Sequence, residues 1–117
     1  MKKLISYDLG TGGAKASLYD SSLNTLARSF VEYETVYPEP DYHEQSPKDW
    51  WNSIVESTKK LLKETGTDPE EVVCLALSGA SLVTVPLDAQ DRELVERVPI
   101  WSDKRAKAEA EEFFSRY

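Results

Sequence analysis

A glycine-rich bend near the start of the chain constrains its fold more than any other feature. Three of the four residues at 10–13 are glycine, and runs of strand-forming residues at 4–7 and 14–19 lie on either side. Glycine tolerates a positive φ, so three glycines in four positions predict a turn here. A polar turn at 20–24 and a run rich in β-branched and aromatic residues at 25–36 follow. Three strands joined by tight turns predict an antiparallel meander.

A helix is predicted after the meander. Two prolines break the strand pattern and indicate a loop at 37–45. Ser46 followed by Pro47 is typical of a helix start, and Gly66 of a helix end. Between them apolar residues recur with the helical period, so we expect this helix to pack against the sheet. The residues expected on its packed side are Trp50, Trp51, Ile54, Val55, Leu61 and Leu62.

The second half of the chain continues with alternating elements. Residues 72–77 predict a buried strand in which Cys74 is an inert, buried thiol. A further strand is expected at 82–87, and Ser102 is typical of the cap of a last helix that runs to the final residue. Because nothing stops this helix, we expect the chain to be part of a longer protein.

Composition excludes several classes of protein. The 117 residues correspond to one domain at most, and 40% of them are hydrophobic, which is enough for a core. The net charge of −7 argues against a nucleic-acid partner. No leader and no membrane-spanning apolar run is present in the sequence, so we expect no membrane partner and a cytoplasmic location.

The segment at 8–15 carries the chemistry. Asp8 stands at a strand tip, where a carboxylate can hold Mg²⁺ together with water. Thr11, Gly12 and Gly13 let backbone N–H groups approach an anion closely, and Lys15 supplies a compact positive charge. This pattern favours a phosphate site, and therefore ATP and Mg²⁺ as cofactors. A plain hairpin turn, which also favours glycine and aspartate, is the alternative interpretation.

Asp-x-Gly-Thr between two strands resembles the first phosphate motif of the actin, hexokinase and heat-shock-chaperone ATPase superfamily. The run Glu-Gln-Ser-Pro-Lys-Asp-Trp-Trp at 44–51 and the run Pro-Ile-Trp-Ser-Asp-Lys-Arg-Ala at 99–106 are similar to segments of the FGGY carbohydrate kinases. That family includes xylulose, glycerol, ribulose and gluconate kinases. The three segments occur in the family's order across essentially the whole chain.

The resemblance implies a fold and an activity. The fold is an α/β, ribonuclease-H-like (actin-like ATPase) domain, with a mixed sheet that begins with an antiparallel three-stranded meander and is flanked by helices. Residues 1–117 would form part of the N-terminal domain, with the second domain absent. The activity is ATP-dependent phosphorylation of a small sugar or polyol, inactive in this chain alone because the general base lies outside it. Surface that the second domain would cover is compatible with self-association as a homodimer.

The resemblance also implies where a sugar binds. Ala80 and Ser81 match a substrate-contacting turn, and Trp101 and Asp103 match the aromatic and acidic positions of the later segment. The turn departs from the family, because xylulose kinases usually have Gln-Met-His there and glycerol kinases Gln-Arg-Glu. The identity of the sugar therefore stays open. Trp101 can equally be a core anchor, and Asp103 a helix-start acid paired with Arg105.

Two further alternatives remain at this point. His43 lies between acidic residues in a proline-bounded loop, and we expect it to be solvated rather than a metal ligand. The alternative function is a non-catalytic ATP-binding or interaction module of the same superfamily, in which the hairpin is structural.

Overall fold

The computed structural model describes residues 1–117, which divide into two compact units. The first, here called the sheet unit, comprises Met1–Glu34 and Lys48–Ala80. The second, here called the loop unit, comprises Thr35–Pro47 and Ser81–Tyr117. Each unit has its own internal contacts and is described by itself.

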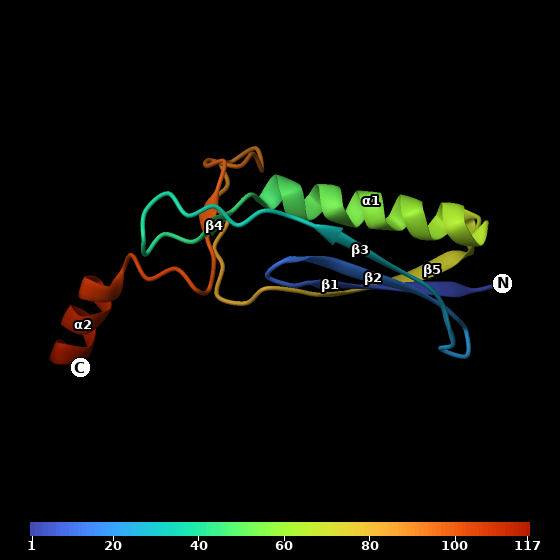
Figure 1. Cartoon of the computed structure of the whole chain (residues 1–117), viewed down its shortest axis with the longest axis horizontal. Coiled ribbons are helices and arrows are strands. Elements are labelled where there is room, and N and C mark those ends of the chain that lie inside the picture. The colour runs from blue at the N-terminus through green and yellow to red at the C-terminus, as the bar shows by residue number, and fades with distance from the viewer. The chain divides into compact units, whose positions relative to one another are not determined.

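The sheet unit is built on a four-stranded mixed sheet (Figure 1). Strands β1 (Lys3–Leu9), β2 (Gly13–Asp20) and β3 (Thr25–Glu32) form an antiparallel meander, and β5 (Val72–Ser78) lies parallel to β1. The order across the sheet is β3-β2-β1-β5. The predicted α/β class and the opening meander are confirmed. β3 is shorter than the run predicted at 25–36.

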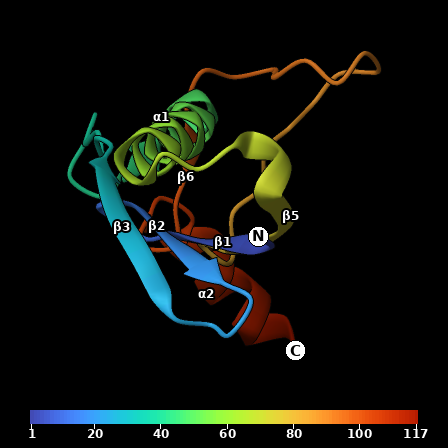
Figure 2. The same ribbon diagram turned by 90° about the vertical axis from the view of Figure 1, so that its right-hand side faces the viewer.

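Helix α1 (Pro47–Thr65) covers one face of this sheet (Figure 2). Ser53, Ser57 and Leu61 are spaced four apart and buried, as expected for one face of a helix. The hydroxyl of Tyr7 on β1 lies 2.6 Å from the hydroxyl of Thr58 on α1. The buried core cluster of the sheet unit consists of Ile5, Tyr7, Ala16, Leu18 and Leu61.

Helix α1 begins and ends where the sequence predicted, but one of its tryptophans is not packed as expected. The helix starts at Pro47 as predicted, and Gly66, with a φ of +63°, follows its last residue. Trp51, expected on the packed side, is 65% exposed. The helical period therefore located the buried face correctly at Leu61, while tryptophan at the margin of that face stays in solvent.

The prediction that Cys74 is buried is wrong, because the structure shows it exposed. β5 forms at the expected place, but it is the outermost strand beside β1, and Leu75 and Leu77 are more than 60% exposed on it. An apolar run is typical of a strand covered on both sides. Here the run lies at the sheet edge, so its side chains remain accessible.

The loop unit contains short elements only. β4 (Glu44–Gln45) pairs with β6 (Val98–Pro99) in an antiparallel ladder. The strand predicted at 82–87 is wrong, since that segment contributes only an isolated bridge from Leu87 to Glu93. Leu82 is 89% exposed there, so no burial holds the segment in an extended ladder.

The last helix, α2 (Lys107–Arg116), starts five residues after the predicted cap. Ser102 does not cap it; its hydroxyl contacts the ring of His43 instead. The residue before the helix is Ala106, which supplies no side-chain cap. A short 3₁₀ helix, η1 (Pro69–Glu71), completes the elements of the chain. No helix of the chain combines the length and the apolar character needed to cross a bilayer.

Candidate functional site

Asp8 lies near the end of β1, on the sheet face opposite α1. Its neighbour Tyr7 is buried against the helix, and because side chains alternate along a strand, Asp8 is exposed on the other face. Lys15 on β2 is its direct cross-strand partner, also exposed. No ion pair or hydrogen bond engages the Asp8 carboxylate or the Lys15 ammonium, so both charges are available at one end of the sheet.

The bend between β1 and β2 is closed by a hydrogen bond from the N–H of Gly10 to the carbonyl of Gly13 (3.0 Å). The predicted turn is present, although its glycines do not have a positive φ, which among the glycines occurs at Gly66. Space is what requires glycine at position 13. A Cβ there would lie 2.5 Å from the carbonyl oxygen of Val31. A Cβ on Gly12 would meet no atom within 4 Å, so open space adjoins the backbone at that position.

Lys15 belongs to a shallow, cationic hollow on the open face of the sheet. The hollow has a volume of about 500 Å³, and Ser17, Arg28 and Phe30 also line it. Arg28 lies opposite Ser17 in the β2–β3 register. Arg28 could not be recognised from the sequence, because only the pairing of β2 with β3 places it opposite Ser17, two positions along β2 from Lys15. Two cations therefore stand on one face of a chain whose net charge is −7.

Tyr33 is a second residue that the sequence did not indicate. It comes directly after β3, and its hydroxyl donates to the carbonyl of Gly10 in the bend. Its backbone N–H donates to the carbonyl of Gly12 (3.3 Å). Burial, with a further contribution from the charge of Asp8, raises the pKa of Tyr33 to about 12. The phenol is therefore a neutral donor near the bend at ordinary pH.

The turn that follows β5 lies at the same edge of the sheet as the bend. β1 and β5 are parallel, and Asp8 is the register partner of Ser78. A Cβ on Gly79 would lie 3.6 Å from the Cβ of Leu9. The sheet unit thus brings Ala80 to the edge that carries Asp8, as expected for the carboxyl ends of parallel strands, where α/β sheets commonly bind ligands. Ser81 follows as the first residue of the next segment of the loop unit.

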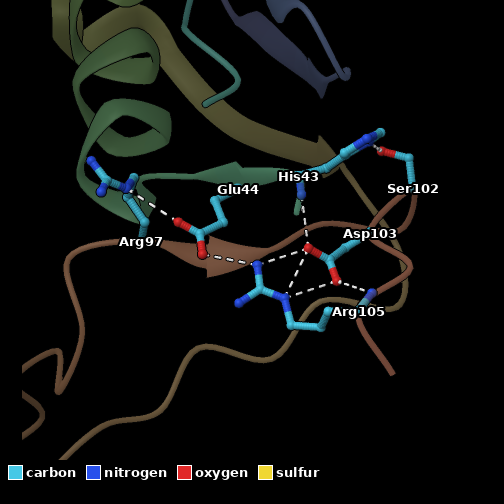
Figure 3. A network of polar contacts seen from close by, with 6 residues as sticks. All are labelled: His43, Glu44, Arg97, Ser102, Asp103 and Arg105. Atoms are coloured by element: carbon cyan, nitrogen blue, oxygen red, sulfur yellow. Dashed lines mark hydrogen bonds and ion pairs between the residues drawn. The ribbon is translucent and has the colours of Figure 1, made fainter. Parts of the chain in front are cut away.

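Within the loop unit, Asp103 forms the centre of a polar network (Figure 3). Its carboxylate accepts the backbone N–H of His43 (2.8 Å) and the guanidinium of Arg105 through Nε (2.9 and 3.0 Å) and one terminal nitrogen (2.8 Å). The side chain is only 6% exposed. Hydrogen bonds from Arg105 are the main reason why the pKa of Asp103 falls to about 2.

Arg105 extends the network to a second carboxylate. The same terminal nitrogen donates to Glu44 (2.8 Å), and the guanidinium carbon lies 3.8 Å from the ring centroid of Tyr42. Glu44 also pairs with Arg97 (3.3 Å). The alternative interpretation of Asp103 and Arg105 as a local ion pair is therefore correct. The second ion pair, between Arg105 and Glu44, joins segments about sixty residues apart in the sequence.

His43 and Trp101 occupy distinct positions beside this network. His43 is only partly solvated, since it is half-buried, its Nδ1 lies 2.7 Å from the hydroxyl of Ser102 and its ring meets Tyr37 edge-on. Trp101 is 59% exposed, while its neighbour Ile100 is only 4% exposed. Ile100 is thus the core anchor of this segment, and the indole of Trp101 is presented at the surface.

The predicted site residues fall into two groups. Those that the sheet unit gathers at one edge are Asp8, Thr11, Gly12, Gly13, Lys15 and Ala80. Those of the loop unit are Ser81, Trp101 and Asp103. No group of three or more histidine, cysteine, aspartate or glutamate side chains could hold a metal ion between them.

The known proteins compared with this chain are carbohydrate kinases. Glycerol kinase 2 of Thermotoga maritima is 28% identical over 105 residues, which cover 90% of this chain and 21% of that protein. A xylulose kinase from Brucella ovis superposes with a TM-score of 0.90 at 29% identity, over 97% of this chain and 24% of that one. A glycerol kinase from Plasmodium falciparum, solved with ADP, shares the fold (TM-score 0.84, 18% identity, 100% of this chain and 24% of that one).

The chain spans about a fifth of the length of the curated relatives that it matches. The family model for the N-terminal domain of the FGGY carbohydrate kinases matches residues 4–116. Since that match covers nearly every residue of both units, the chain belongs to the FGGY family of carbohydrate kinases.

Proposed function

We propose that the protein carrying this chain transfers the terminal phosphate of ATP to a hydroxyl of a sugar or polyol. The observation that carries the proposal is the edge of the sheet at Asp8. An unpaired carboxylate and the unpaired ammonium of Lys15 stand there beside open space at Gly12. In a chain of a carbohydrate kinase family, this combination supports a site for the phosphate tail of ATP.

Asp8 fits a magnesium ion bound in the manner usual for nucleotides. Mg²⁺ keeps several waters and takes one or two carboxylates together with substrate phosphates, rather than an all-protein cage. At the bend the chain offers the exposed carboxylate of Asp8, and no cluster of three or more candidate ligands is present, which suits that mode. When bound, the ion would neutralise charge on the phosphate oxygens.

The bend would supply the rest of the phosphate contact. Phosphoryl transfer depends mainly on positioning and on charge stabilisation, so a protein needs few groups here. Lys15 would offer a point charge, and the exposed backbone of Thr11 and Gly12 would approach the phosphates without steric obstruction. Gly13 would act indirectly, because its missing side chain lets β3 support the bend at Val31.

The substrate would lie at the adjoining turn. Ala80 is at the same sheet edge as Asp8, and Ser81 continues the turn with a hydroxyl. An exposed Trp101 suits packing against the apolar face of a small polyol, as aromatic rings do in ligand sites. Asp103 would act by holding this loop, since its carboxylate already accepts bonds from His43 and Arg105.

The complete reaction would need polypeptide outside these 117 residues. The matched relatives are about five times as long, and we propose that the group accepting the hydroxyl proton comes from such additional sequence. For the 117-residue chain alone we therefore expect weak phosphate binding and no turnover.

The test uses a full-length polypeptide that carries this segment. Glycerol, xylulose, ribulose and gluconate are each incubated with ATP and Mg²⁺, and phosphorylated product is measured directly. We expect one of them to be phosphorylated, and Asp8→Asn to lower kcat by about 100-fold or more with the fold retained. Asp91→Asn is the matched control, because Asp91 is exposed and its φ of +60° suits asparagine. ATP hydrolysis without any phosphorylated sugar would contradict the proposal and support a non-catalytic nucleotide-binding module.

A further inference from the structure

His43 contacts three of the four residues of one turn in the loop unit (Figure 3). The turn is closed by a hydrogen bond from the N–H of Asp103 to the carbonyl of Ile100 (2.9 Å). The carbonyl of His43 accepts the N–H of Ile100 (3.0 Å), and its own N–H donates to the carboxylate of Asp103 (2.8 Å). Its Nδ1 lies 2.7 Å from the hydroxyl of Ser102. The fourth residue of the turn is Trp101.

The imidazole of His43 acts on the centre of this turn. Turns with the same closing hydrogen bond differ in the orientation of their central peptide, which here joins Trp101 to Ser102. The contact between the imidazole and the Ser102 hydroxyl ties this central pair to a segment 59 residues earlier in the chain. The backbone contacts of His43 hold the two ends of the turn, and its side chain holds the middle.

The ring of His43 is itself ordered by a second contact. It meets the ring of Tyr37 edge-on, with centroids 4.8 Å apart and an angle of 82° between the planes. The residue is also half-buried. A side chain that is already ordered costs little entropy when a ligand binds beside it, so His43 suits a permanent support for the turn.

The turn determines where Trp101 begins. The indole is exposed, while the neighbouring Ile100 is buried and anchors the segment. Any contact that the indole makes starts from a Cα position that the turn sets. A change in the centre of the turn would therefore move the aromatic ring relative to a bound substrate.

We propose that His43 is a positioning residue for the sugar or polyol. Through Ser102 its imidazole holds the turn so that the ring of Trp101 packs against the substrate. This inference rests on the proposed function, and it adds a residue that sets affinity for the substrate but not for ATP.

The test is His43→Phe in the full-length polypeptide that carries this segment. It is assayed with ATP and Mg²⁺ on whichever of glycerol, xylulose, ribulose and gluconate the wild type phosphorylates. Phenylalanine keeps a ring beside Tyr37 and removes the bond to Ser102. Ser102→Ala removes the same bond from the other partner. Ser115→Ala is the matched control, because its exposed hydroxyl bonds the carbonyl of Glu112 within α2.

The kinetic constants should change in a specific way. We expect His43→Phe and Ser102→Ala each to raise the KM for the sugar or polyol about fivefold, the usual effect of one hydrogen bond. The kcat and the KM for ATP should stay unchanged, because only substrate binding is affected. The double variant should be no worse than either single variant, since both remove one interaction. Ser115→Ala should change none of these constants.

A spectroscopic readout accompanies the kinetics. The indole N–H resonance of Trp101 in the 117-residue chain, assigned with Trp101→Phe, reports the surroundings of the ring. We expect His43→Phe and Ser102→Ala to shift this resonance and Ser115→Ala to leave it in place. A resonance unmoved by both variants would contradict the inference.

The outcomes separate this inference from the proposed function. If the wild type phosphorylates none of the four compounds, the proposed function fails and the inference fails with it. If the wild type is active but both variants keep its KM for the substrate, or raise the KM for ATP by the same factor, His43 is merely structural and the inference alone is wrong. Effects of His43→Phe and Ser102→Ala that multiply in the double variant would also contradict it. Should His43→Phe not fold, Ser102→Ala decides by the same criteria.

Discussion

Arg105 donates to both carboxylate oxygens of Asp103, and one of the same nitrogens also donates to Glu44 (2.8 Å). Asp103 and Glu44 are only 6% and 14% exposed, so one guanidinium serves two largely buried carboxylates. Glu44 lies in β4 and Asp103 follows β6, and the network therefore joins the two halves of the loop unit. Its energetics can be tested one partner at a time.

Removing Arg105 should destabilise the loop unit strongly. Arg105→Ala would leave the nearly buried Asp103 without a counter-charge and Glu44 with Arg97 alone, so we expect a clearly lower urea midpoint than that of the wild type. Arg92→Ala is the matched control, because Arg92 is 74% exposed and its side chain contacts only the nearby Asp88 and Gln90. It should cost less than about 1 kcal/mol. Urea denaturation followed at the amide resonances of the loop unit measures both, and equal losses would contradict the account.

The stability of the loop unit should depend on pH through Asp103. Its pKa of about 2 lies below the value of about 4 expected in the unfolded chain. A depressed folded-state pKa gives stability that is complete above pH 4 and is lost as the pH falls from about 4 to about 2. The difference in urea midpoint between wild type and Asp103→Asn should therefore be largest above pH 4 and narrow toward pH 2. A difference that stays constant over this range would show that the ionised carboxylate is not responsible.

Substitution by alanine should lower the stability of the chain at Gly13 but leave it nearly unchanged at Gly12. In Gly13→Ala the new Cβ would lie 2.5 Å from the Val31 carbonyl, and we expect a loss of about 1–3 kcal/mol in the free energy of unfolding. In Gly12→Ala the Cβ meets open space, so stability should change by no more than about 0.5 kcal/mol. Binding of Mg²⁺-pyrophosphate by Gly12→Ala should nevertheless weaken, because the methyl group occupies the approach to the backbone. Thermal unfolding and a binding titration check the pair, and similar stability losses would contradict the packing argument.

Leu61 should carry much of the contact between α1 and the sheet. It is fully buried, and Leu61→Ala should lower the free energy of unfolding by about 2–5 kcal/mol. Leu77→Ala in the same unit is the control, since Leu77 is 64% exposed on the edge strand. Its loss should stay below about 1 kcal/mol. Chemical denaturation of the two variants compares them, and a small loss for Leu61→Ala would show that α1 is held mainly by other contacts.

The sequence predicted the elements that local patterns determine. Strand alternation and the turn residues located the meander. Pro47 and Gly66 marked the ends of α1, because the fixed φ of proline and the tolerance of glycine for a positive φ are local properties of single residues. The sequence also predicted that Asp8 and Lys15 lie on the two strands on either side of the bend. Their register across β1 and β2 follows directly from the hairpin.

Features that depend on long-range contacts were not predictable. Tyr33 reaches the bend, and His43 meets Ser102 and Asp103, only through contacts between residues far apart in the chain. Cys74 looked buried because its neighbours are apolar, but exposure depends on which elements cover β5. The glycines of the bend were expected to provide backbone freedom, whereas at Gly13 the decisive factor is the closeness of β3.

A titration of the chain with Mg²⁺-pyrophosphate, followed by amide NMR, tests the central claim most directly. Asp8 and the bend are predicted to bind the phosphates, so shifts should concentrate at residues 8–15 and report saturable binding. Asp8→Asn should weaken that binding about tenfold or more while leaving the spectrum of the folded sheet unit intact. Shifts concentrated elsewhere in the chain, or binding by Asp8→Asn as tight as that of the wild type, would contradict the account.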